Sequence, residues 1–183
     1  ERVEILYGAN AIQGIGATGG LINYVTLAPA ETDGWEFRYE AGITVADELA
    51  DDGNAYRGAL TALGRFGAFD LVASAAVEDR GAFYDADGRL IGVDTTQGDI
   101  QDSESTNLFA KFGWNIDDKT RLQLMVNTYE IAGNGDYVTV DGDRSTGLPT
   151  SSEKGTYEGI PATNDVLTVS LDASRKDVFG GTV

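Results

Sequence analysis

The side chains that could carry chemistry in this sequence are carboxylates, hydroxyls, lysines and arginines, because it contains no histidine and no cysteine. This composition excludes thiol nucleophiles, the usual structural zinc sites, disulfides and every histidine-based catalytic triad. The carboxylate pairs Glu36/Glu40 and Glu78/Asp79 are spaced closely enough for acid–base chemistry. Arg38 lies between Glu36 and Glu40, so a charged ladder facing a lumen explains them more simply. We therefore assign no catalytic residue and expect no enzyme.

Three acidic clusters could bind a cation, because closely spaced oxygen ligands suit Ca²⁺. None of them completes the twelve-residue calcium loop that ends in glutamate. Asp-Gly is also an ordinary turn signal, so we favour solvated turns and predict no metal and no cofactor. The clusters are residues 51–54 (Asp-Asp-Gly-Asn), 85–88 (Asp-Ala-Asp-Gly) and 141–143 (Asp-Gly-Asp).

Residues 14–19 match the glycine pattern G-x-G-x-x-G of dinucleotide-binding proteins. That site requires a helix directly after the glycines, whose N-terminus holds the pyrophosphate. Here residues 21–26 (Leu-Ile-Asn-Tyr-Val-Thr) are typical of a strand instead. The glycines are better explained by tight turns and close backbone packing.

The formal net charge of −17 argues against nucleic-acid binding, which needs lysines and arginines facing phosphates. The sequence has no run of 18 or more apolar residues, so it predicts no transmembrane helix, and no signal peptide is recognisable. The sequence opens at Glu1 without a methionine and stops at Val183 directly after a turn-like segment. We expect both ends to be cut and the chain to be a fragment.

The elements that must position these side chains are strands, because apolar and polar residues alternate with a period of two. In residues 35–46 the odd positions are apolar and the even positions are mostly polar, over about the length of a membrane-crossing strand, roughly 9–11 residues. Five further segments repeat this pattern. The six predicted strands are residues 35–46, 55–66, 69–77, 106–116, 121–131 and 165–176.

The connections between these strands distinguish a membrane barrel from a soluble β-sandwich, which would also show alternation. Short turns (67–68, 117–120 and 177–180) alternate with long links (47–54, about 81–105 and about 132–164). Outer-membrane barrels have short periplasmic turns and long external loops. Aromatic residues are predicted at the periplasmic ends of the strands, as expected of an interfacial girdle. They are Trp35, Phe66, Phe69 and Trp114.

The first 26 residues carry a more specific signal. Residues 1–6 (Glu-Arg-Val-Glu-Ile-Leu), followed by a glycine-rich stretch and residues 19–26 (Gly-Gly-Leu-Ile-Asn-Tyr-Val-Thr), resemble the end of the plug domain of TonB-dependent outer-membrane receptors. The Arg-Gly-Pro usual in that family is Tyr7-Gly8-Ala9 here, and its Tyr-Gly is Gln13-Gly14. The resemblance implies an all-β fold. It consists of a transmembrane antiparallel β-barrel fragment of about six strands (31–183), preceded by the C-terminal part of a plug domain (1–30).

The function implied by this resemblance is energised import across the bacterial outer membrane. The expected ligand is a ferric siderophore, with cobalamin and carbohydrate as alternatives, and the expected partners are TonB and outer-membrane lipid. A β-rich secreted or cell-surface binding module, or a passive porin, would be the rival classes. From the alternation we predict five lumen-facing residues that contact the plug: Glu36, Arg38, Glu40, Arg57 and Arg65.

Overall fold

The computed structural model describes residues 2–8, 19–45, 51–93, 101–156 and 158–177. Its regular elements are strands and one short 3₁₀ helix, so the predicted all-β class is confirmed. Of the glycine motif at 14–19, only Gly19 lies within the described residues. The elements are β1 (Arg2–Tyr7), β2 (Gly20–Val25), β3 (Gly34–Thr44), η2 (Asp51–Gly53), β4 (Ala55–Phe66), β5 (Phe69–Arg80), β6 (Ser103–Asn115), β7 (Thr120–Gly133), β8 (Tyr137–Val140), β9 (Ser151–Lys154) and β10 (Thr163–Arg175).

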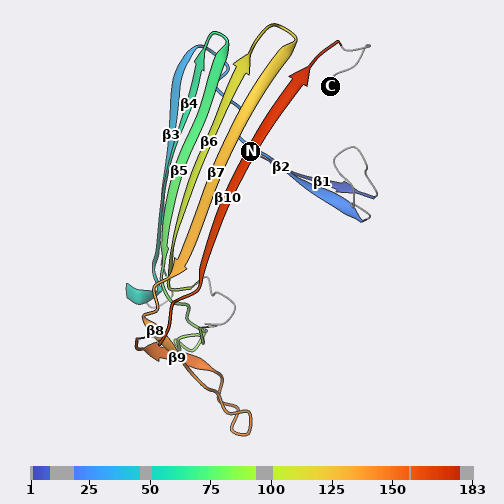
Figure 1. Cartoon of the computed structure of the whole chain (residues 1–183). Helices are drawn as coiled ribbons and strands as arrows, with labels where there is room; N and C mark the ends of the chain where they lie inside the picture. Colours follow the sequence, from blue (N-terminus) through green and yellow to red (C-terminus); the bar gives the residue numbers. More distant parts are fainter. Residues whose placement is uncertain (1, 9–18, 46–50, 94–100, 157, 178–183) are drawn as a thin grey trace.

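The main body is one tall, curved, antiparallel six-stranded sheet (Figure 1). Its order is β10-β7-β6-β5-β4-β3, so each of these strands pairs with its neighbours along the chain, and all six predicted strands are confirmed. β1 and β2 form a separate hairpin that projects away from the sheet, and β8 pairs with β9 in the long connection after β7.

The tight turns lie at one end of the sheet and the long connections at the other (Figure 1). Gly67 takes a φ of 57° in the two-residue turn between β4 and β5, a conformation that glycine adopts without steric cost. The Asp117 carboxylate accepts N–H groups of Lys119 and Thr120 in the turn between β6 and β7. The predicted turn at 177–180 lies, apart from Asp177, outside the described residues.

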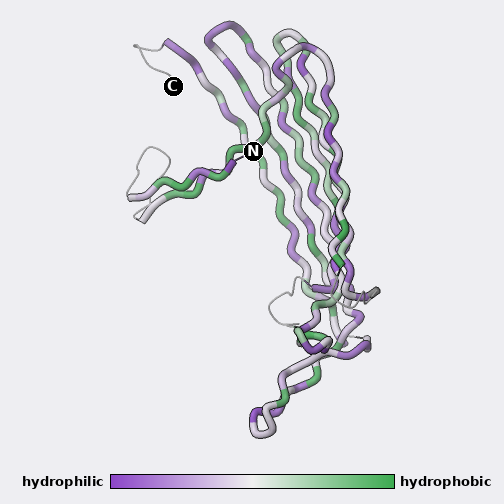
Figure 2. The backbone as a smooth tube through the Cα atoms, turned by 180° about the vertical axis from the view of Figure 1, so that it is seen from behind, coloured by the Kyte–Doolittle hydropathy of each residue, from purple (hydrophilic) through white to green (hydrophobic). Residues whose placement is uncertain are grey.

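Figure 2 shows hydrophobic and hydrophilic residues alternating along the strands of the sheet, and the large apolar side chains of one face are exposed. Phe37, Leu167 and Leu171 are 64%, 69% and 75% accessible. In a soluble sandwich these side chains would be covered by a second sheet, and no second layer covers them among the described residues. An apolar outer face and a polar inner face are the pattern of a transmembrane β-barrel wall. The described residues include no helix long and apolar enough to cross a membrane.

The predicted aromatic band lies at the tight-turn end. Phe69 stands opposite both Phe66 and Trp114 in the register of the sheet. The ring centroids of Phe69 and Trp114 are 5.8 Å apart, and those of Trp35 and Phe66 are 5.2 Å apart. Gly64 makes the second contact possible, because a Cβ there would lie 2.8 Å from the Trp35 ring. The shared level expected of an interfacial girdle is therefore present.

Candidate functional site

The inner face of the sheet carries a segment that we call the strap, residues 26–33, between β2 and β3. It begins against β6, where the Lys111 ammonium donates to the Thr26 hydroxyl at 3.0 Å and to the Leu27 carbonyl. It ends near the turn between β4 and β5, where the Gly67 N–H donates to the Asp33 carboxylate at 3.1 Å. Since β6 and β3 are separated by β4 and β5, the strap crosses the inner face of four strands.

The middle of the strap covers the small apolar core of the described structure. Ala30 packs with Leu63 and Val72, whose side chains are 1% and 0% exposed, and Leu27 packs against the same cluster. Arg65 adds a polar contact, because its Nε donates to the Ala30 carbonyl at 2.6 Å. The strap is therefore attached by both apolar burial and charge-assisted hydrogen bonds.

Beside the strap, Asp70 and Arg121 form a bidentate ion pair with N···O distances of 2.7 and 2.9 Å. The Asp70 side chain is 1% exposed, so the guanidinium is its necessary counter-charge. The pair passes over Gly113, the residue that stands opposite Asp70 in β6. A Cβ at Gly113 would lie 2.2 Å from the arginine and 2.3 Å from the carboxylate, so glycine leaves the space that the pair occupies.

The register places all five predicted lumen-facing residues on this inner face. Two pairs of them are in contact: Arg38 with Glu36 at 2.7 Å, and Arg57 with Glu40 at 3.6 Å. Arg65 contacts the strap. Glu36 and Arg38 also line a cavity of about 530 Å³ between β3 and the strap. Contact between any of the five and a plug remains a prediction.

The strap contact of Lys111 and the Asp70–Arg121 pair beside it involve residues that were not selected from the sequence. Asp70, Lys111 and Arg121 belong to the polar halves of their alternating strands, but alternation does not distinguish them from other inner-face residues. The signal that could have singled them out is Gly113. It interrupts the inner-face series of β6 opposite a carboxylate.

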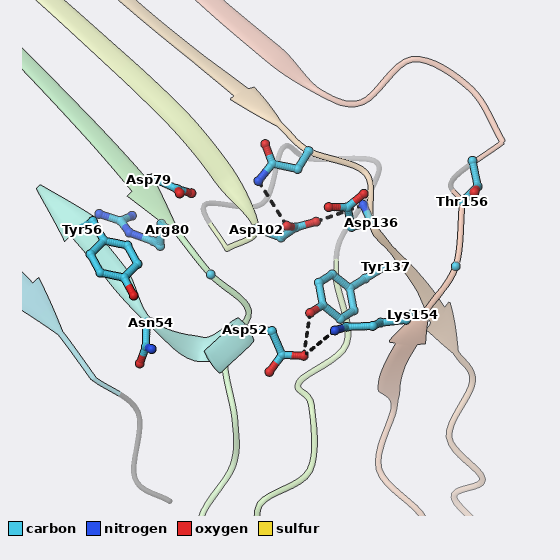
Figure 3. Close-up of a pocket in the computed structure, with 13 residues that line it drawn as sticks. Asp52, Asn54, Tyr56, Asp79, Arg80, Asp102, Asp136, Tyr137, Lys154 and Thr156 are labelled. Atoms are coloured by element: carbon cyan, nitrogen blue, oxygen red, sulfur yellow. Dashed lines mark hydrogen bonds and ion pairs between the residues drawn. The ribbon is translucent and has the colours of Figure 1, made fainter. Parts of the chain in front are cut away.

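At the other end of the sheet, Asp52 joins three long connections, and Figure 3 shows its contacts with Tyr137 and Lys154. Its carboxylate accepts the Tyr84 hydroxyl at 2.5 Å and the Tyr137 hydroxyl at 3.0 Å, and it lies 3.2 Å from the Lys154 ammonium. The Tyr84 hydrogen bond, followed by those of Lys154 and Tyr137, lowers the pKa of Asp52 to about 2 against the opposing effect of burial. Burial and Asp52 raise the pKa of Tyr84 to about 12, and that of Tyr137 is raised for the same reasons.

Next to Asp52, Asp102 closes the connection between β5 and β6 at an unusual φ of 47°. Its carboxylate accepts the Asn134 amide at 3.2 Å and the backbone N–H of Asp136 at 3.1 Å. Asp52 and Asp102 line the same open cavity of about 630 Å³ at the loop end (Figure 3). This cavity collects residues from all three long connections.

Two of the three acidic clusters form hydrogen bonds within their own loops. Asp85 accepts backbone N–H groups of Asp87 and Arg89, and Asp143 accepts that of Ser145, which are the contacts of Asx turns. In the cluster at 51–54, Asp52 makes the contacts given above. Within the part of the chain that the structure describes, no group of three or more acidic side chains is arranged to hold a metal ion.

The fold and the strap together define the class: a wall segment of a membrane β-barrel with an N-terminal segment docked on its inner face. The chain is 31% identical to the rhizobactin receptor of Rhizobium meliloti (strain 1021) over 187 residues. It is 30% identical to the ferric aerobactin receptors of Escherichia coli and Klebsiella pneumoniae. Each alignment covers 98% of this chain and 25% of the relative.

The chain thus spans about a quarter of the length of the curated relatives it matches. No family model and no solved structure matches it. Nearly the whole chain aligns with three receptors, and the fold is the one that the plug-to-barrel motif implied. The chain belongs to the family of TonB-dependent outer-membrane receptors.

Proposed function

We propose that this chain forms part of a receptor that imports a ferric siderophore across the bacterial outer membrane with energy supplied through TonB. Its main support is the similarity of 98% of the chain to receptors named for rhizobactin and ferric aerobactin. Those relatives are receptors rather than enzymes, in keeping with a chain that has no histidine and no cysteine. Residues 1–30 are assigned to the plug and residues 31–183 to the barrel.

The two ends of the sheet support separate roles in this proposal. The end with long connections has a polar cavity next to Asp52 and Asp102, where loops gather as they would around the mouth of a receptor. The end with tight turns and the aromatic band is assigned to the periplasmic side. The strap enters there and leads from the barrel wall to the plug hairpin. Ligand bound at the mouth would be released inward when the plug rearranges.

The ligand class can be tested on the complete receptor, purified in detergent. Quenching of its intrinsic fluorescence would be titrated with ferric aerobactin, ferric rhizobactin, cobalamin and a maltooligosaccharide. We expect saturable binding of at least one ferric siderophore, with an affinity at least 100-fold above that for cobalamin or the oligosaccharide. This corresponds to a difference in binding free energy of about 2.7 kcal/mol. Tighter binding of cobalamin or the oligosaccharide would assign the receptor to that alternative ligand.

Localisation separates the receptor from the rival soluble module. The complete protein should sediment with outer-membrane vesicles and resist extraction at high salt, since an apolar barrel wall is held by lipid and not by charge. Recovery of the folded protein from the soluble fraction would support a secreted or cell-surface β-rich module instead.

A further inference from the structure

Lys111 occupies an unusual position for a lysine. The residue is 6% exposed, and lysine is almost never fully buried unless its charge is compensated. Its ammonium donates to Thr26 and Leu27, which lie 85 and 84 residues earlier in the chain. The Asp70 carboxylate attracts this ammonium and the Arg121 guanidinium repels it. The first residues of the strap are thus held by a buried cation from a distant strand.

The location of this contact determines where a force on the β1–β2 hairpin would first reach the sheet. Thr26 directly follows β2, the second strand of the hairpin assigned to the plug, so Lys111 binds the chain where it leaves that hairpin. β1 and β2 pair with each other, and the strap that follows them contacts the sheet through Thr26 and Ala30. A pull on the hairpin would therefore reach Lys111 before the remaining strap or β3.

We propose that Lys111 is a positioning residue that fixes the strap to the barrel wall, so that movement of the plug during transport ends at Thr26. The Asp70 carboxylate supports this contact, since it is 1% exposed and attracts the Lys111 ammonium. The apolar contact of Ala30 with Leu63 and Val72 and the Arg65 hydrogen bond hold the next part of the strap. The transport half of this inference rests on the proposed function, and the anchoring half does not.

The anchoring half can be measured in the complete receptor by pulsed electron–electron resonance. Spin labels would be placed on cysteines introduced at Ala28, an exposed strap residue, and at Asp118 in the turn between β6 and β7. Lys111→Met keeps the length of the side chain but removes its charge and its donors. This variant should raise the population of detached strap on the order of 10–100-fold, because a hydrogen bond from a charged donor favours the attached strap by about that factor. The distribution of distances between the two labels should therefore broaden.

Two variants make this result specific. Lys111→Arg retains the charge and the donors and should restore a narrow distribution. Lys119→Met is a matched control at the same end of the sheet, where the lysine is exposed and pairs with Asp177, and it should leave the distribution unchanged. If the distances between the labels in Lys111→Met are distributed as narrowly as in the unsubstituted receptor, the proposal is overturned.

The transport half uses the same variants in cells and measures uptake of radioactive iron bound to aerobactin. Lys111→Met should lower the uptake rate without changing the affinity for the ligand, whereas Lys111→Arg and Lys119→Met should not. A detached strap with unchanged uptake would overturn the transport role of Lys111. If the unsubstituted receptor takes up no siderophore iron, the proposed function fails, and the spin-label distances still decide whether Lys111 anchors the strap.

Discussion

At the scale of single residues, glycines determine where long side chains can lie on this sheet. Gly64 leaves room for the Trp35 ring on the outer face, and Gly113 leaves room for the Asp70–Arg121 pair on the inner face. In both cases a residue without a side chain allows a neighbouring strand to fill the space. Gly113 has the larger consequence, because the buried carboxylate of Asp70 depends on the space that this glycine leaves.

Gly113→Ala should destabilise the receptor by about 3 kcal/mol, because the added methyl displaces the arginine and leaves Asp70 buried without its counter-charge. The matched control is Gly42→Ala, also on the inner face, where a Cβ would meet nothing within 4 Å. Urea unfolding of the receptor in lipid vesicles gives both free energies. Equal stabilities for the two variants would show that the pair does not depend on Gly113.

Asp52 gives the long connections a predictable response to acid. Its pKa of about 2 in the folded protein lies below the ordinary value of about 4. A carboxyl group with a lowered pKa stabilises the fold above the unfolded value, and this contribution is lost as the pH falls through the folded value. The β8–β9 hairpin, held by Tyr137 and Lys154, should therefore loosen between pH values of about 4 and about 2.

The measurement is the anisotropy of a fluorophore attached to a cysteine at Arg144, an exposed position in the connection between β8 and β9. The anisotropy should fall across that pH interval in the unsubstituted receptor. Asp52→Asn should give a lower value already at neutral pH, with little further change on acidification. An unchanged anisotropy in Asp52→Asn would mean that other contacts hold the hairpin.

At the scale of elements, the sequence pattern located the six long strands but not all of their ends. β5 continues to Arg80, beyond the predicted end at Val77, and β6 begins at Ser103 instead of residue 106. The apolar outer-face residues end before the backbone pairing does, since Asp79 still pairs with Glu104, as expected of a barrel strand that extends beyond a lipid layer. The alternation of apolar and polar residues indicates which part of a strand has an apolar outer face. It does not indicate how far the backbone hydrogen bonding extends.

Features built from distant parts of the chain were not accessible from the sequence. β8 and β9 have four residues each, too few to show a period, and they pair across a loop. The five predicted lumen-facing residues share one face of the sheet, because a common face follows from local alternation. The contacts of Lys111 with Thr26 and of Asp52 with Tyr84 depend on how the strap and the loops return to the sheet.

The orientation of the strands predicts a difference between neighbouring positions in β10. Leu171→Arg on the outer face should cost about 2–4 kcal/mol near the middle of the lipid layer. Ser170→Arg faces the lumen beside Met125 and should cost much less. Urea unfolding in lipid vesicles compares the two, and a larger cost for Ser170→Arg would reverse the assignment of the faces.

At the scale of the whole molecule, the sheet has three distinct surfaces. The outer face is apolar, the inner face is polar and carries the strap, and the end with long connections has a polar cavity. β3 and β10 each have one edge without a partner strand among the described residues. Open edges and an exposed apolar face favour association in water, whereas lipid and a closed barrel remove both.

The 183-residue chain alone should therefore aggregate in water after dilution from urea. Mild detergent should reduce this aggregation by covering the outer face. Light scattering and size-exclusion chromatography distinguish the two states. A monodisperse, folded product in detergent-free buffer would contradict the assignment of the outer face to lipid.

We propose above all that the chain forms part of a TonB-dependent siderophore receptor. It is tested most directly by uptake of radioactive iron, supplied as ferric aerobactin or ferric rhizobactin, into cells whose only siderophore receptor is the complete protein. We expect iron to accumulate in cells with TonB, and to bind at the surface without accumulating in cells that lack it. Equal accumulation with and without TonB, or none from either siderophore, would contradict it.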